Sequence, residues 1–253
     1  DPIPAIPLSQ HFFANSLRIA PDNPVLRIEN QMLLAGDTVI CAARDVRDVT
    51  VPEGITTIGR GAFYSAQVER VTLPEGLTNI QKEAFNGCFA LRSVSLPESL
   101  QSIGDSAFDW CRSLTEITLP GSLEKIGEAA FIYCGMREIT IPKGIAEIAR
   151  MAFYHCDQLE TVHLQEGLRG IGWDAFSECA SLSDIRLPNT LERIELRAFA
   201  HCTSLKQLTI PASVTTMYAG FVDADTVLLV ERGSTMETWL QEEGYQYTLV
   251  EVE

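Results

Sequence analysis

The pair Ala-Phe recurs seven times along this chain at nearly constant spacing. The intervals between its phenylalanines are 22 or 23 residues, and these phenylalanines are Phe63, Phe85, Phe108, Phe131, Phe153, Phe176 and Phe199. A fixed period of about 20 to 50 residues is typical of a solenoid, in which each repeat packs only against its neighbours. We therefore expect one elongated body, where a length of 253 residues alone would suggest one or two compact domains.

Each repeat places apolar residues at the same positions relative to its Ala-Phe pair. Leu100 and, three residues later, Ile103 show the first two positions. After the pair come a cysteine, a leucine or its equivalent, and an alternating segment that ends in proline, such as Thr115–Leu119 before Pro120. Alternation predicts a strand with one buried face, and proline ends the strand because it has no N–H. The Ala-Phe-x-x-Cys segment is too short for a full helix, so we expect one helical or 3₁₀ turn there.

The two ends of the chain depart from this pattern. We expect an N-terminal β-hairpin cap over residues 1–45, because a solenoid must cover the apolar end of its first repeat. Residues 46–221 hold about seven regular repeats and one degenerate repeat. Residues 222–253 are predicted to form a strand–helix–strand cap, since a capping box begins at Ser234 and Gly244 fits the C-terminal stop of a short helix.

The charge balance argues against two classes of partner. The chain has 34 acidic and 19 basic residues, for a net charge of −15. Nucleic acids and anionic membrane surfaces both need clustered Lys and Arg, so neither is expected to bind. No apolar run approaches the roughly 18 residues that suggest a membrane span, so no membrane insertion is predicted. The opening Asp1-Pro2-Ile3-Pro4 looks like the start of a mature or trimmed protein.

The repeat unit resembles a known family. Its pattern, Leu-x-x-Ile-Gly-x-x-Ala-Phe-x-x-Cys-x-x-Leu-x-x-Ile-x-Leu-Pro, is clearest in residues 100–120 and 123–142. Over residues 46 to about 221 it resembles the leucine-rich repeats of BspA-type bacterial surface proteins, also called Treponema pallidum-type repeats. The resemblance implies an α/β, right-handed solenoid of 22–23-residue repeats with a parallel sheet on its concave face. It also implies an extracellular or cell-surface protein that binds host proteins, and it brings no catalytic motif.

Six of the seven cysteines recur once per repeat, at Cys88, Cys111, Cys134, Cys156, Cys179 and Cys202. A metal site needs ligands that converge on one point, and cysteines spread over six layers do not converge. Stacked layers bring neighbouring Cα atoms within disulfide range, but equivalent Cβ atoms point the same way. Reduced, buried thiols are therefore favoured over disulfides. No nucleophile elbow, phosphate-binding loop or metalloprotease motif is present, so we expect no enzyme, cofactor or metal.

One candidate binding surface lies on the concave sheet. An outward row of mostly Thr and Ser is interrupted on two consecutive layers by a histidine and an arginine, and acidic residues flank the interruption. The predicted contact residues of this face are Glu116, Glu138, Thr161, His163, Asp184 and Arg186. The alternative is an ordinary salt-bridged surface with no partner, on which the stacked hydroxyl residues stabilise only the sheet.

A second candidate surface lies on the opposite side. Trp110, Tyr133 and His155 occupy one position in three consecutive repeats. Exposed aromatic residues are typical anchors for protein or sugar partners, so Trp110 and Tyr133 join the candidate residues. The alternative is that the rings lie flat over the turn of the adjacent layer.

These observations favour a monomeric interaction module displayed on a cell surface. It would bind a host or neighbouring-cell macromolecule, an extracellular protein or a glycan, through the faces of the solenoid. The second hypothesis is a structural spacer or scaffold segment of a larger cell-surface protein, with no ligand of its own. A varied outward row favours binding and a monotonous row favours a spacer; the observed row is monotonous with one interruption.

Overall fold

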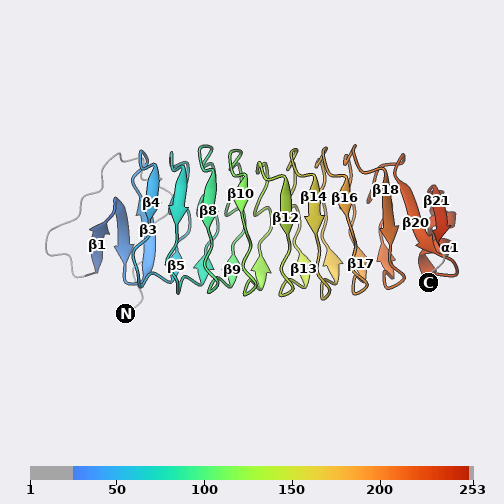
Figure 1. Ribbon diagram of the computed structural model, residues 1–253, viewed down its shortest axis with the longest axis horizontal. Helices are drawn as coiled ribbons and strands as arrows, with labels where there is room; N and C mark the ends of the chain where they lie inside the picture. Colours follow the sequence, from blue (N-terminus) through green and yellow to red (C-terminus); the bar gives the residue numbers. More distant parts are fainter. Residues whose placement is uncertain (1–24, 251–253) are drawn as a thin grey trace.

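The computed structural model describes residues 25–250, and it confirms the predicted leucine-rich-repeat solenoid. Successive repeats stack along one long axis, so that β1 and α1 lie at opposite ends of the molecule (Figure 1). Equivalent strands of neighbouring repeats pair in parallel, for example Val71 with Val94. Each repeat contributes two short strands, which form two parallel rows.

The first row contains the alternating strands, all but one of which are followed closely by a proline, and we call it row A. Its members are β4 (Asp48–Thr50), β6 (Arg70–Thr72), β8 (Ser93–Ser95), β10 (Glu116–Ile117), β12 (Glu138–Thr140), β14 (Thr161–His163), β16 (Asp184–Ile185) and β18 (Gln207–Ile210). Most are shorter than the alternating segments predicted. At the start of β10, for example, Thr115 N and Glu116 N both donate to Arg92 O in the preceding repeat, and the strand begins only at Glu116.

The second row, row B, was not predicted. Its strands are β5 (Thr57–Ile58), β7 (Asn79–Ile80), β9 (Ser102–Ile103), β11 (Lys125–Ile126), β13 (Glu147–Ile148), β15 (Gly170–Ile171), β17 (Arg193–Ile194) and β19 (Thr216–Met217). Each has two residues, which is too few to show an alternating pattern. Their isoleucines recur at apolar positions of the repeat and are buried, but that pattern does not predict that their backbones pair.

The Ala-Phe segments form consecutive turns, so the expectation of a helical or 3₁₀ turn is wrong. Their N–H groups alternate between two uses. Ala84 N donates to Gln81 O in its own repeat, whereas Phe85 N donates to Ala107 O in the next repeat at 2.8 Å. Residues on either side of the pair, such as Glu83 (φ 60°) and Gly87 (φ 72°), adopt left-handed backbone conformations. A helix cannot continue through these positions, because it needs uninterrupted right-handed residues.

The Ala-Phe phenylalanines form the axis of the core. From Phe63 to Phe199 consecutive ring centroids lie 4.8 to 5.6 Å apart, and the ring planes are within 12° of parallel. The repeated cysteines lie beside this column. Each thiol donates to the carbonyl oxygen of the phenylalanine in the preceding repeat at 2.9 to 3.2 Å, as Cys88 does to Phe63. The cysteines are thus polar links between layers as well as small apolar core residues.

The ends of the described chain differ from the repeats. β1 (Leu26–Glu29), β2 (Met32–Ala35) and β3 (Thr38–Ala42) pair in antiparallel fashion, and β3 then pairs in parallel with β5 of row B. The part of the predicted N-terminal cap before residue 25 lies outside the described residues. At the other end, β20 (Val227–Glu231) and β21 (Tyr247–Val250) extend row A in parallel and are joined by α1 (Thr235–Glu243).

The predicted ends of this helix are confirmed. The Ser234 side chain accepts a hydrogen bond from Glu237 N at 3.3 Å, and Gly244 has the left-handed conformation (φ 74°) of a C-terminal stop. The Glu237 carboxylate turns back and accepts a hydrogen bond from Gly233 N at 2.6 Å.

Candidate functional site

The predicted strand-face residues gather on one small sheet. Row A is divided into separate hydrogen-bonded groups, and β12, β14 and β16 form a three-stranded group of their own. Its register places Glu138 beside Thr161 and Thr161 beside Asp184. Arg186 follows immediately after β16.

Glu116 is the exception among these residues. It lies on β10, which pairs with β8 and not with β12, so it belongs to the neighbouring group. The division coincides with a repeat that is one residue shorter, around Gly135. A Cβ atom on Gly135 would lie 2.3 Å from Arg112 O, so only glycine allows the chain to pass at this point.

Except for the half-buried Thr161, the side chains of this group are exposed, and they include both acidic and basic residues. His163 Nε2 lies 2.8 Å from Glu138 Oε1, and both side chains are about half exposed or more, at 48% and 67%. An exposed pair of this kind contributes little to stability. Arg186 is also exposed and forms no ion pair within residues 25–250. An open surface of this kind does not shield a reacting group from water, so it favours contact with a partner over chemistry.

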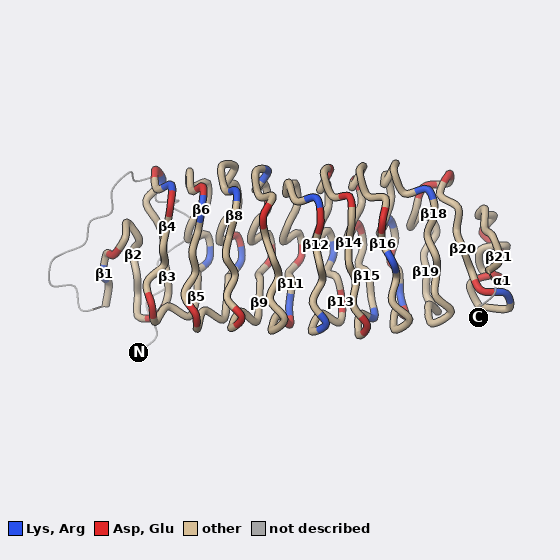
Figure 2. Tube along the Cα trace, in the orientation of Figure 1, with Lys and Arg blue, Asp and Glu red and all other residues tan. Residues whose placement is uncertain are grey.

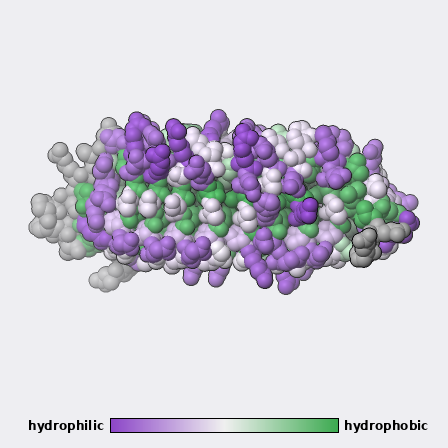
Figure 3. All heavy atoms as spheres, viewed as in Figure 1, coloured by the Kyte–Doolittle hydropathy of each residue, from purple (hydrophilic) through white to green (hydrophobic). Residues whose placement is uncertain are grey.

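The rest of row A is more uniform. In the row that contains His163 and Arg186, the residues before the interruption are all exposed hydroxyl residues: Thr50, Thr72, Ser95, Thr118 and Thr140. Beside them, three half-buried leucines occupy the same position of their repeats, at Leu96, Leu164 and Leu187. Figure 3 shows a hydrophobic band along the middle of this view, between hydrophilic margins. Acidic and basic residues are interspersed along both strand rows (Figure 2).

Trp110, Tyr133 and His155 form a stacked aromatic column on the Ala-Phe turns. The centroids of Trp110 and Tyr133 are 4.4 Å apart, and those of Tyr133 and His155 are 4.7 Å apart. All three residues have left-handed backbone conformations and are half-buried. The Arg112 guanidinium lies over the rings of Trp110 and Tyr133, at 4.4 and 5.4 Å from their centroids. Each ring therefore contacts the ring of the neighbouring layer.

A hollow that was not predicted from the sequence lies at one end of this column. Tyr64, Asn86, Phe89 and Asp109 line it together with Trp110. Phe89 is one of the most exposed large apolar residues, at 56%. Burial raises the pKa of the Asp109 carboxyl to about 6. One signal in the sequence indicates the hollow: Gly87 occupies the position that the next repeats fill with Trp110 and Tyr133.

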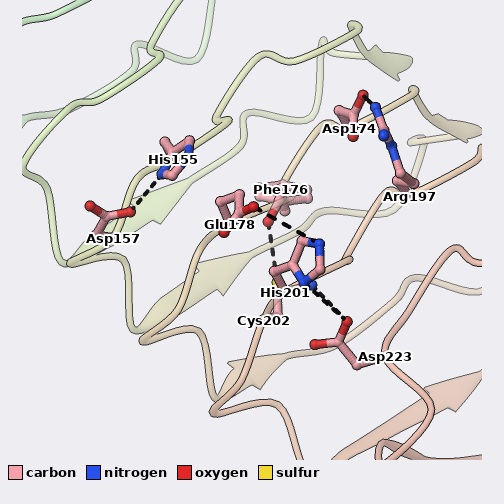
Figure 4. A network of polar contacts seen from close by, with 9 residues as sticks. All are labelled: His155, Asp157, Asp174, Phe176, Glu178, Arg197, His201, Cys202 and Asp223. Atoms are coloured by element: carbon pink, nitrogen blue, oxygen red, sulfur yellow. Dashed lines mark hydrogen bonds and ion pairs between the residues drawn. The ribbon is translucent and has the colours of Figure 1, made fainter.

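The histidines and cysteines form no reactive pair on the described chain. His155 lies 3.2 Å from Asp157, and His201 lies between Glu178 and Asp223 at 3.9 Å from each (Figure 4). The Cys202 thiol instead points into the core, where it donates to Phe176 O. Burial raises the pKa of Cys202 to about 12, so the thiol stays protonated and unreactive at neutral pH.

The remaining charged pair in Figure 4 joins two neighbouring repeats. Asp174 is almost fully buried, and Arg197 of the next repeat covers it at 2.8 Å.

All seven cysteines are free. Within residues 25–250, no group of three or more His, Cys, Asp or Glu side chains could hold a metal ion. In that part of the chain, no helix is both long and apolar enough to cross a membrane.

A family model described as BspA-type leucine-rich repeat region matches six copies over residues 38–160 and 124–227. This chain belongs to the BspA-type leucine-rich repeat family. The repeat prediction made from the Ala-Phe period is thereby confirmed. No curated protein matches the sequence.

Two solved structures are similar to this BspA-type protein over most of its length. The leucine-rich repeat protein of Treponema pallidum is 25% identical, with a TM-score of 0.61 over 85% of this chain and 91% of that chain. A leucine-rich cell surface protein from Faecalibacterium prausnitzii is 23% identical, with a TM-score of 0.59 over 84% of this chain and 77% of that chain. BspA-type repeats and their solenoid fold are typical of interaction modules and not of enzymes.

Proposed function

We propose that this protein is a non-enzymatic interaction module, displayed on a bacterial cell surface, that binds a protein of a host or a neighbouring cell. The contact surface is the strand face formed by β12, β14 and β16. The observation that carries the proposal is the change in the outward row at His163 and Arg186, after five consecutive hydroxyl residues.

The composition of this face suits a protein partner. Arg186 is exposed, forms no ion pair within the described residues, and is followed by the half-buried Leu187. Arginine is enriched among the residues that dominate binding energy, and protein interfaces combine an apolar centre with a polar rim. Asp184, Glu138 and His163 supply such a rim on the same three strands.

Surface display is supported by the relatives. The similar protein from Faecalibacterium prausnitzii is itself a cell surface protein. The excess of acidic residues also suits a protein that must stay soluble and monomeric outside the cell.

A structural spacer is the second candidate, and the uniform part of row A favours it. The hydroxyl residues from Thr50 to Thr140 can interact with one another across neighbouring strands, and this requires no binding partner. The two candidates differ in what they predict for the interruption, because a spacer has no use for His163 and Arg186 as a pair.

A binding screen tests the proposal. The intact protein is passed over arrays of extracellular-matrix and bacterial surface proteins, and any partner is titrated against the His163→Ala/Arg186→Ala double variant. The matched control is Arg70→Ala/Thr72→Ala, which removes an arginine and a hydroxyl residue from β6 on the same face.

We expect the first double variant to lose at least about tenfold in affinity, as for the arginine hot spots of other interfaces, and the control to keep wild-type affinity. Equal affinities of the two double variants would contradict the assignment of this face. No partner in the whole screen would support the spacer.

A further inference from the structure

A surface of mixed basic and aromatic character lies where the Ala-Phe turns begin, in the C-terminal half of the solenoid. Three consecutive repeats place Arg150, Trp173 and Leu196 at one position, two residues after the isoleucine of row B. Met151 N donates to Trp173 O at 2.9 Å, which joins the first two layers here. Asp174 N donates to Leu196 O at 3.2 Å, which joins the second and third. An exposed cation, an exposed ring and a half-buried apolar side chain therefore lie on successive layers.

The Trp173 ring lies beside two guanidinium groups, one from each neighbouring repeat. Arg150 Cζ is 5.4 Å from the ring centroid, and Arg197 Cζ is 5.9 Å from it. Contacts of this kind hold a guanidinium in place without neutralising its charge. Arg150 is exposed, the Arg197 side chain is 53% exposed, and Trp173 itself remains 43% exposed. The groups offered to a partner are therefore the two guanidiniums and the uncovered part of the ring.

Arg150 lacks the carboxylate that neutralises its equivalent elsewhere. In the first repeat the equivalent residue is Arg60, which pairs at 3.4 Å with Glu83 of the next repeat. Asp174 occupies the position of Glu83 in the repeat after Arg150. The Asp174 carboxylate lies 2.8 Å from Arg197, which uses it instead (Figure 4). Arg150 consequently forms no ion pair within residues 25–250.

The charge of this surface selects an acidic partner. The chain as a whole has a net charge of −15, so two adjacent guanidiniums, one of them without an ion pair, are a local exception. Complementary charge steers association and suppresses partners of the wrong sign. Arginine clusters are also a recurrent means of recognising acidic peptide motifs, because the planar guanidinium binds a carboxylate through two parallel hydrogen bonds.

The apolar part of this surface favours a protein over an acidic glycan. Tryptophan, tyrosine and arginine are the residues that most often dominate the binding energy of protein interfaces. The half-buried Tyr154 follows Arg150 in the same turn, and the half-buried Leu196 follows Trp173 on the next layer. An aliphatic side chain of a peptide can pack on Leu196, whereas a sugar acid carries only hydroxyls and carboxylates beside its ring.

We propose that this surface binds an extended acidic segment of a partner protein, in which carboxylates alternate with apolar residues. One carboxylate accepts hydrogen bonds from Arg150, and the next accepts from the nitrogens of Arg197 that do not contact Asp174. The apolar residue between them packs on Leu196 and the uncovered part of Trp173. Two repeats are about 10 Å apart and alternate residues of an extended peptide are about 6.8 Å apart, a difference that the long side chains of Arg and Glu cover.

This site is separate from the strand face formed by β12, β14 and β16, because it lies on the Ala-Phe turns. A second copy of this chain is disfavoured as the occupant, since two molecules that each carry a net charge of −15 repel each other.

The test is fluorescence anisotropy of a labelled heptapeptide, Gly-Glu-Leu-Glu-Leu-Glu-Gly, titrated with the intact protein. We expect a Kd of about 100 µM, as for a small exposed contact, and an affinity that falls as salt is added. The same peptide with Gln in place of each Glu should bind at least about tenfold more weakly. Arg150→Ala and Trp173→Ala should each weaken binding of the acidic peptide by about tenfold or more. Both residues are exposed, so both variants should keep the wild-type fold, which circular dichroism verifies.

Arg60→Ala is the matched control. Arg60 has the same position in its repeat and a side chain that is 51% exposed, but it is paired with Glu83 and is followed one repeat later by Lys82 in place of a tryptophan. Its variant should bind the acidic peptide as wild type does. The His163→Ala/Arg186→Ala variant should also bind the peptide normally, so that this site and the strand-face site can fail separately.

Three results would overturn the proposal directly: no binding of the acidic peptide, equal binding of its Gln counterpart, or wild-type affinity of Arg150→Ala. Binding of an oligogalacturonate without binding of the peptide would assign the surface to an acidic glycan and would also overturn it. Self-association of the protein in sedimentation that Arg150→Ala abolishes would do the same, because it would make a second copy the occupant.

Discussion

Replacing Phe131 by alanine should remove a large part of the stability of this solenoid. The Phe131 ring is fully buried in the middle of the phenylalanine column. It stacks between Phe108 and Phe153, with centroid distances of 5.3 and 5.4 Å and nearly parallel planes. Truncating a buried phenylalanine costs about 3 to 5 kcal/mol, because the lost transfer free energy adds to the cavity left behind. Aromatic contacts contribute about 0.5 to 1.5 kcal/mol each beyond buried area, so the upper half of that range is expected.

The assay is urea unfolding of wild type and variant, followed by circular dichroism and by tryptophan fluorescence. Two probes are needed because a repeat protein can unfold in segments, and coincident curves justify a single free energy of unfolding. Phe89→Ala is the matched control, since it deletes the same ring from a side chain that is 56% exposed. It should change the free energy of unfolding by about 0.5 kcal/mol or less. A wild-type midpoint for Phe131→Ala, or equal destabilisation by Phe89→Ala, would contradict a large contribution of the Phe131 ring to stability.

Two further predictions concern titratable groups. In the native protein a thiol reagent should react quickly with no cysteine other than the half-buried Cys41, because the other six thiols are buried. After unfolding, all seven cysteines should react. Several fast-reacting thiols in the native protein, or fewer than seven reactive thiols in denaturant, would contradict this prediction. Burial raises the pKa of Asp109 from 3.8 to about 6, so its ionisation costs stability as the pH rises through this window. The free energy of unfolding of Asp109→Asn, relative to that of wild type, should therefore be higher at pH 7 than at pH 4, by on the order of 1 kcal/mol for this partly exposed group. Urea titrations that give the same difference between variant and wild type at both pH values would contradict the raised pKa of Asp109.

The candidate strand-face residues could be selected from the sequence because they break a repeating row. Once the period is known, position within the repeat identifies His163 and Arg186 as outward neighbours on consecutive layers. Which strands pair could not be read in this way. Glu116 belongs to a different hydrogen-bonded group from Glu138, because β10 pairs with β8 and not with β12.

The hollow at Asp109 shows the same limit more clearly. Its residues come from three repeats, and Gly87 is the one whose position in the repeat gives a signal. The absence of a side chain at Gly87 matters only because Tyr64 and Trp110 lie on the layers to either side. One carboxylate oxygen of Asp109 is buried without a hydrogen-bond partner within residues 25–250, and this too is a consequence of packing, which composition and period do not report.

The sequence by itself determined the features that depend on residues close along the chain or on strict repetition. These are the 22–23-residue period, the buried phenylalanines and cysteines, and the helix bounded by Ser234 and Gly244. The tertiary structure alone decided the contacts between layers. These contacts join residues about one repeat apart. They are the strand pairing of row B, the hydrogen bonds from the Ala-Phe turns to the next repeat, and the thiol hydrogen bonds to phenylalanine carbonyls. Such contacts depend on how one layer is placed on the next, and two-residue strands and left-handed turns leave too little local pattern to reveal that placement.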